Sequence, residues 1–143
     1  MNQVIVSVVQ DLIVISEARR SGYESAVSKI NDPELKEKFK ECIEQSNVFV
    51  YGMTPFIQDI DQIEIIPELV EPVCKEWEKV GSIIKSTPSV LVASCLNAEK
   101  VTAKAFESSL KEALPITIQE IVSQELAQIE GAMICLKQLN SDR

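Results

Sequence analysis

The residues of this sequence most able to do chemistry are its carboxylates, because the sequence contains no histidine. Without an imidazole, a Ser–His or Cys–His nucleophile is excluded. The sequence also has no glycine-rich phosphate loop and no nucleophile-elbow motif. We therefore expect a protein that is not an enzyme and that carries no cofactor.

Several glutamates would be able to hold a hard cation through carboxylate oxygens alone if they met at one point. The candidates are Glu41, Glu44, Glu107, Glu125 and Glu130. Glutamate is seldom fully buried unless it is paired. The ordinary interpretation is that these residues lie on solvated helix faces.

The four cysteines, at positions 42, 74, 95 and 135, are widely spaced and form no C-x-x-C pair. A zinc site uses closely spaced pairs of cysteines. Scattered cysteines in a reducing compartment are usually small buried hydrophobic residues. We expect that role here.

The charge balance, 14 Lys and Arg against 22 Asp and Glu, gives a formal net charge of −8. Nucleic acids and anionic membranes both attract clustered basic residues, so neither is an expected partner. The apolar start of the chain, Met1 to Ile15, lacks a basic n-region and is interrupted by Asp11, unlike a signal peptide. No stretch approaches the roughly 20 apolar residues of a membrane span. We expect a soluble, cytoplasmic protein.

Apolar residues spaced three and four apart predict an all-α chain that forms a single four-helix-bundle domain over residues 1–143. The expected long helices cover about residues 2–30, 33–58, 88–113 and 116–140, and a shorter crossover helix covers about 68–85. A loop is expected from Asp59 to Pro67. Short connections favour two antiparallel helical hairpins, which the crossover segment joins.

Capping residues mark where these helices begin. Asn2, Asp32 and Thr87 are each suited to accept hydrogen bonds from free backbone amides, and proline follows the last two. Thr117 to Glu120 forms a possible capping box for the last helix. Trp77 is expected to anchor the crossover helix, because its large ring buries much apolar area.

The apolar stripes of the long helices become polar in their middle. The residues concerned are Ser16, Arg20, Ser46, Glu99 and Thr102. One interpretation is a buried ion pair of Arg20 and Glu99, with the three hydroxyl groups supplying hydrogen bonds, since buried charges are tolerated only when paired. The other is that the stripes drift, so that both charges reach solvent.

Short segments along nearly the whole chain resemble a family of short bacterial ferritin-like four-helix proteins, most without an assigned function. The segments are Asp11-Leu12-Ile13, Gly22-Tyr23, Asp32-Pro33-Glu34-Leu35, Phe39, the crossover around Trp77, Glu99 and Ala105-Phe106-Glu107. The resemblance implies a ferritin-like bundle of two hairpins joined by a crossover.

Di-iron members of this fold use a Glu on each of two helices and Glu-x-x-His on each of the other two. In this sequence the corresponding pairs are Glu44 with Asn47 and Glu130 with Met133, and Arg20 stands at an acidic position. A guanidinium has only donors and does not bind a cation. The resemblance therefore implies a degenerate metal site that has lost its ligands.

We expect a non-catalytic protein that acts as a homodimer or homo-oligomer, or with another protein. The second helix carries more apolar residues than one buried stripe needs, at Val48, Val50, Tyr51 and Ile57, and such a surplus marks interfaces. One alternative is a small apolar ligand held between the helices, which nothing in the sequence localises. The other is weak, carboxylate-only binding of iron or manganese for storage or oxidation. That alternative requires Glu44, Glu99 and Glu130 to converge.

Overall fold

The structure of the protein is a computed structural model that describes residues 2–58 and 67–142. Within this part of the chain all regular structure is helical. The elements are α1 (Gln3–Val27), α2 (Pro33–Met53), the 3₁₀ turn η1 (Thr54–Phe56), α3 (Pro67–Ser82), α4 (Pro88–Ser109) and α5 (Ile116–Ser141). The prediction of an all-α chain is confirmed. The loop expected from Asp59 lies outside the described residues, except for Pro67, which begins α3.

Three of the predicted helix starts are confirmed by their caps. The side chains of Asn2, Asp32 and Thr87 each accept a hydrogen bond from a first-turn amide of α1, α2 and α4 respectively. The capping box predicted for the last helix is wrong. Because α5 already begins at Ile116, Thr117 lies inside its first turn, and the residue before the helix is Pro115.

Several helices end earlier than predicted. α1 ends at Val27 instead of residue 30, and α4 ends at Ser109 instead of residue 113. α2 ends at Met53, because Pro55 has no N–H to continue the helical ladder. The Thr54 side chain donates to the Val50 carbonyl at 2.7 Å, and the chain then tightens into η1.

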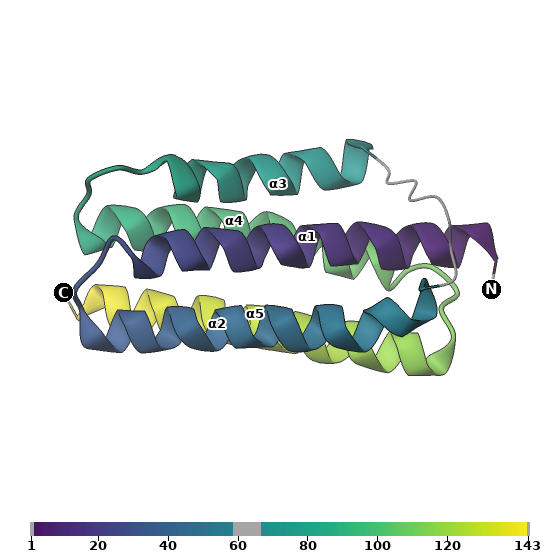
Figure 1. Ribbon diagram of the computed structural model, residues 1–143. Helices are drawn as coiled ribbons and strands as arrows, with labels where there is room; N and C mark the ends of the chain where they lie inside the picture. The colour runs from purple at the N-terminus through teal and green to yellow at the C-terminus, as the bar shows by residue number, and fades with distance from the viewer. Residues whose placement is uncertain (1, 59–66, 143) are drawn as a thin grey trace.

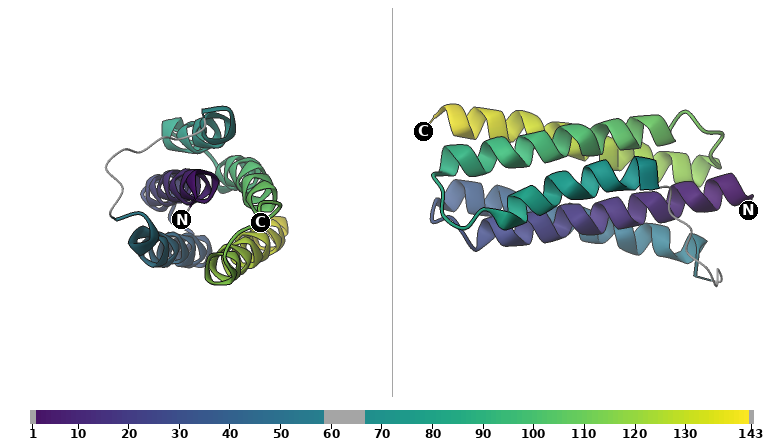
Figure 2. Two further views of the ribbon diagram at one scale, coloured as in Figure 1. Left: turned by 90° about the vertical axis from the view of Figure 1, so that its right-hand side faces the viewer. Right: turned by 90° about the horizontal axis from the view of Figure 1, so that it is seen from above.

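The four long helices form a bundle whose neighbouring members run antiparallel (Figures 1 and 2). α1 and α5 each pack against α2 and α4, so α1 and α5 lie diagonally across the bundle. α3 lies outside this square and packs on both α1 and α4. Since α3 returns the chain to the end where α2 began, α2 and α4 run in the same direction.

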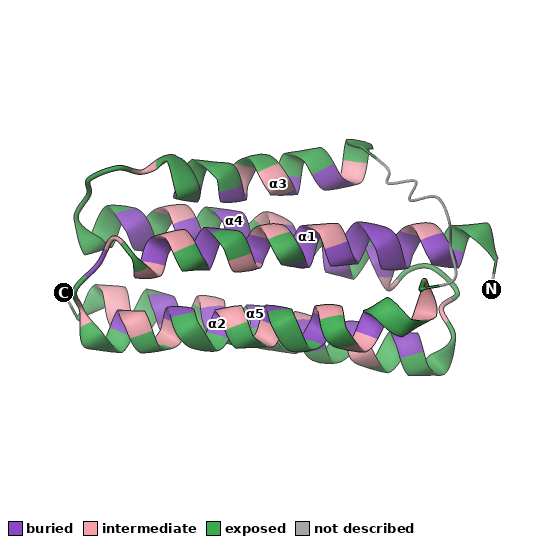
Figure 3. Ribbon diagram, viewed as in Figure 1, coloured by how far each residue is buried: buried purple, intermediate pink, exposed green. Residues whose placement is uncertain are grey.

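The core lies between the five helices, and α1 has the largest share of buried residues because α2, α3 and α4 surround it (Figure 3). Trp77 of α3 is buried, as predicted for an anchor. Its ring packs against that of Tyr23 with centroids 5.0 Å apart. A Cβ at Gly22 would lie 2.5 Å from Trp77 Cε3, so α1 and α3 approach closely only because position 22 has no side chain.

None of the described helices combines the length and the apolar character that crossing a membrane requires.

Candidate functional site

Of two adjacent arginines in α1, Arg19 faces the interior. The prediction of a buried Arg20 is wrong: Arg20 is partly exposed, and its Nε lies 3.1 Å from Oε1 of Glu24 on the same helix. Arg19 is fully buried. Neighbouring helix positions point about 100° apart. The buried face therefore continues from Ser16 by three residues to position 19, and not by four to position 20.

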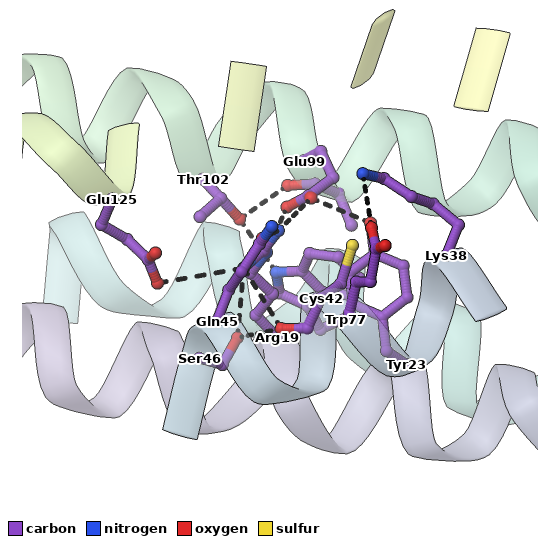
Figure 4. A network of polar contacts seen from close by, with 12 residues as sticks. Arg19, Tyr23, Lys38, Cys42, Gln45, Ser46, Trp77, Glu99, Thr102 and Glu125 are labelled. Carbon is purple, nitrogen blue, oxygen red and sulfur yellow. Dashed lines mark hydrogen bonds and ion pairs between the residues drawn. The ribbon is translucent and has the colours of Figure 1, made fainter. Parts of the chain in front are cut away.

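Arg19 and Glu99 form a two-pronged ion pair at the centre of the bundle (Figure 4). Arg19 Nε donates to Glu99 Oε1 and Nη2 donates to Oε2, both at 2.8 Å. The Tyr23 hydroxyl donates to the same Oε2 at 2.8 Å. Both charged side chains are buried. This parallel geometry is the strongest arrangement of an arginine with a carboxylate.

The remaining N–H groups of Arg19 point to α2. Nη2 donates to Gln45 Oε1 at 3.1 Å, and Nη1 donates to Ser46 Oγ at 3.2 Å and to the Cys42 carbonyl at 3.4 Å. A guanidinium has five N–H donors. Each of the five therefore has an acceptor, and the side chain fills the centre of the bundle with its hydrogen-bonding capacity used in full.

The electrostatics of the centre keep Arg19 charged and Tyr23 neutral. Burial lowers the pKa of Arg19, but the adjacent Glu99 carboxylate more than offsets this, so its pKa lies above the ordinary value. Burial, together with Glu99, raises the pKa of the Tyr23 hydroxyl well above its usual value. Tyr23 is thus a hydrogen-bond donor at neutral pH.

A second carboxylate, that of Glu125 on α5, also reaches this centre (Figure 4). Only 3% of Glu125 is exposed, and its Oε2 lies 3.9 Å from Arg19 Nη1 without a hydrogen-bond partner among the described residues. Burial raises the pKa of Glu125 to about 7; Arg19 opposes this rise and Glu99 adds to it. The interpretation of Glu125 as part of a solvated face is wrong.

The other predicted members of the polar centre are all buried. Ser46 accepts from Arg19, as expected. Thr102 serves a different partner, since its Oγ1 accepts from Trp77 Nε1 at 2.9 Å and donates to the Ala98 carbonyl at 2.8 Å. Ser16 Oγ has no hydrogen-bond partner within the described part of the chain. Thr102 therefore holds α3 in place, and Ser16 supplies no bond to the ion pair.

The carboxylates proposed as metal ligands do not converge. Glu44 and Glu130 are exposed, as are Asn47 and the candidates Glu41 and Glu107, whereas Glu99 is buried against Arg19. Glu44 and Glu130 lie outside the inward stripes of α2 and α5. Across the described residues, no cluster of three or more His, Cys, Asp or Glu side chains is placed to hold a metal ion.

The four cysteines are free thiols. Cys42 and Cys95 are buried, as predicted, while Cys74 and Cys135 are only partly buried. Burial raises the pKa of Cys42 to about 11 and that of Cys95 further still. Both buried thiols are protonated at neutral pH and are poor nucleophiles.

The burial of Arg19 and of Glu125 was not predicted, although the sequence contains a signal for each. Glu24 follows Arg20 by four residues, which is the spacing of a surface ion pair on a helix and favours Arg19 as the buried arginine. Glu125 lies on the stripe Val122, Glu125, Ile129 of α5, with spacings of three and four.

Comparison with protein-family models, with curated proteins and with solved structures gave no match.

Proposed function

We propose that this protein is a non-catalytic helical bundle of the ferritin-like kind that acts through its outer surface by pairing with a second copy of itself. The observation that carries the non-catalytic part is the saturated Arg19–Glu99 pair, because it occupies the place where bundles of this kind hold metal. A guanidinium without a free donor, held by a carboxylate, offers a substrate nothing to react with.

The path of the chain supports the ferritin-like part of the proposal. Two antiparallel hairpins, α1–α2 and α4–α5, are joined by a crossover that carries α3 and makes α2 and α4 run in the same direction (Figure 1). Bundles of the ferritin-like kind have one such long crossover connection. The free cysteines support a reducing, cytoplasmic location.

The outer face of α2 supports the self-association part. Val48 is 60% exposed and Tyr51, one turn further along the same helix, is 85% exposed. The other residues of the predicted surplus, Val50 and Ile57, are partly buried against the core. Most homo-oligomers close through a two-fold axis that places the same patch of both copies in contact. We define this α2 surface by Val48 and Tyr51.

Light scattering coupled to size-exclusion chromatography tests this pairing. The wild-type protein is expected at twice the mass of one chain, and Tyr51→Glu is expected at the mass of one chain, because a charge would be buried unpaired. Ile84→Glu is the matched control, since Ile84 is 93% exposed and lies in the connection between α3 and α4, outside α2. A wild-type monomer at high concentration, or equal loss of the dimer in both variants, contradicts the proposal.

The alternative of carboxylate-only iron or manganese binding has no observation in its favour, because Glu44 and Glu130 point away from Glu99 into solvent. Adding Fe(II) or Mn(II) to chelator-treated protein is expected to leave the melting temperature unchanged. A saturable rise in melting temperature that Glu99→Gln abolishes would favour the alternative.

A further inference from the structure

A pocket of about 160 Å³ lies between α2 and α5, and Glu125 lines it. Its walls include the apolar side chains of Val48, Phe49 and Ile121. Three amide side chains also line it: Gln124 and Gln128 are exposed, and Gln45 is partly buried. The pocket thus joins an apolar wall, amide side chains and a buried carboxylate.

The charges at the inner end of the pocket do not balance. Arg19 brings one positive charge, whereas Glu99 and Glu125 bring two carboxylates, from α4 and α5. Glu99 takes two of the five guanidinium N–H groups, and α2 takes the other three. No donor of Arg19 remains for Glu125, whose Oε2 lies 3.9 Å from Nη1. When Glu125 is ionised, the centre holds one excess negative charge.

A buried carboxylate without a hydrogen bond is unfavourable unless a proton or a cation neutralises it. A hard divalent cation such as Ca²⁺ requires six to eight oxygen ligands. Besides three glutamine amides, this pocket offers one free carboxylate and an apolar wall, which is too few charged oxygen ligands for such a cation. The lining therefore suits a cation that carries its own apolar stem.

We propose that this pocket binds a small primary alkylammonium ion. Its ammonium group donates hydrogen bonds to Glu125 and neutralises the excess charge. Its alkyl chain packs against Phe49, Val48 and Ile121. Engineered apolar cavities of about 150 Å³ hold a molecule the size of benzene, so an alkyl chain of about four carbons fits. Val48 belongs both to this pocket and to the α2 surface, but the ammonium site rests on Glu125, and its test is separate from the test of pairing.

Titration of the wild-type protein with n-butylamine at about pH 8, followed by calorimetry or by NMR shifts of the pocket residues, tests the site. Saturable binding of one butylammonium ion per chain is expected. Glu125→Gln is expected to weaken binding at least tenfold, while Glu130→Gln, which changes an exposed carboxylate of the same helix, leaves it unchanged. Gly52→Leu is expected to abolish binding by filling the pocket, since a Cβ at Gly52 has no neighbour within 4 Å.

Two further experiments test whether binding depends on the charge of the ligand and on the ionisation of Glu125. n-Butanol has the same alkyl chain without the charge and is expected to bind at least tenfold more weakly. Because Glu125 has a pKa of about 7, lowering the pH from about 8 to about 6 is expected to weaken butylammonium binding about tenfold. A lysine side chain of a second copy carries the same ammonium group and is the other possible source of the ligand. If adding butylamine lowers the mass of the protein from that of a dimer to that of one chain, the natural ligand is a lysine of the second copy. If the mass does not change, the natural ligand is a free amine.

Three results would overturn the proposal. One is the absence of saturable binding to the wild-type protein, which leaves a proton as the neutralising partner of Glu125. Another is equal binding of butylamine by wild type and Glu125→Gln. The third is equal affinity for butanol and butylamine, which would make the pocket a purely apolar cavity.

Discussion

Arg19 is the side chain around which the interior of this bundle is arranged. Its guanidinium connects α1 to Glu99 of α4 through two hydrogen bonds of 2.8 Å and to α2 through Gln45, Ser46 and the Cys42 carbonyl. Breaking a buried, hydrogen-bonded pair costs about 3–5 kcal/mol, because the remaining charge is left without a partner. Glu125, in contrast, lies against the same guanidinium without a hydrogen bond.

The free energy of unfolding is predicted to depend on pH through Glu125. Its pKa is raised from 4.5 to about 7 on folding, so between these values the unfolded chain binds fewer protons than the folded one. The contribution of Glu125 to stability is therefore fully present below about pH 4.5 and is lost as the pH rises through 7, a change of roughly 3 kcal/mol. Urea unfolding of wild type and Glu125→Gln over this range measures the effect, which the variant lacks.

The matched control for this pH dependence is Glu130→Gln, because Glu130 is exposed on the same helix. It is expected to follow the wild-type curve. If wild type and Glu125→Gln lose stability in parallel between about pH 5 and pH 8, the buried carboxylate is not the cause.

At the scale of single residues, the sequence predicts that a buried ion pair is present better than it predicts which residues form the pair. The polar interruption in the apolar stripes predicts a buried ion pair of Arg20 with Glu99; a buried pair with Glu99 is present, but its cation is Arg19. The stripe does not distinguish Arg19 from Arg20, because steps of three and four residues are equally helical. Only the four-residue spacing to Glu24 favours a surface position for Arg20. The burial of Glu125 depends on how far α5 is rotated toward α1, and one helix alone does not determine that.

α3 is held in place by the ring of Trp77 and by the absence of a side chain at Gly22. The Trp77 ring lies over Gly22 of α1, and its Nε1 donates to Thr102 of α4 at 2.9 Å. α3 thereby contacts both helices beneath it. The crossover is therefore a packed layer on the bundle and extends the core beyond the four long helices.

Gly22→Ala is predicted to destabilise the protein by about 1–3 kcal/mol, because its Cβ would lie within 2.5 Å of Trp77 Cε3 and force α3 outward. Gly131→Ala is the matched control in α5, where a Cβ meets nothing within 4 Å. Alanine there is expected to raise the free energy of unfolding by up to about 1 kcal/mol, as is usual when glycine is replaced in an exposed helix interior. Thermal unfolding measures both. If Gly22→Ala and Gly131→Ala were equally stable, α3 would move outward without a loss of free energy of unfolding.

The element scale is where the sequence predicts most. Asn2, Asp32 and Thr87 carry side chains that satisfy free amides locally, so three helix starts follow from a few neighbouring residues. The start of α5 does not, because Pro115 precedes it without a side-chain cap. The early end of α1 does not follow from loss of packing, because Ile30, three residues beyond it, is still buried in the core.

At the scale of the whole molecule, the four long helices meet in one polar centre. α1 supplies Arg19, α2 supplies Gln45 and Ser46, α4 supplies Glu99, and α5 supplies Glu125 (Figure 4). A shift of one helix by a single residue would leave a buried charge without its partner. The centre therefore fixes how the helices align as well as how tightly they pack, and its loss is expected to lower the stability of the entire bundle.

A double-mutant cycle on global unfolding tests this account most directly. Wild type, Arg19→Met, Glu99→Gln and the double variant are unfolded in urea, with Arg20→Met as the surface control. Each single change at the centre is predicted to cost about 3 kcal/mol or more, and the double variant to cost at least about 2 kcal/mol less than the sum. Arg20→Met should cost less than about 0.5 kcal/mol. Single losses below about 0.5 kcal/mol, or losses that simply add, would contradict a bundle held by a buried ion pair.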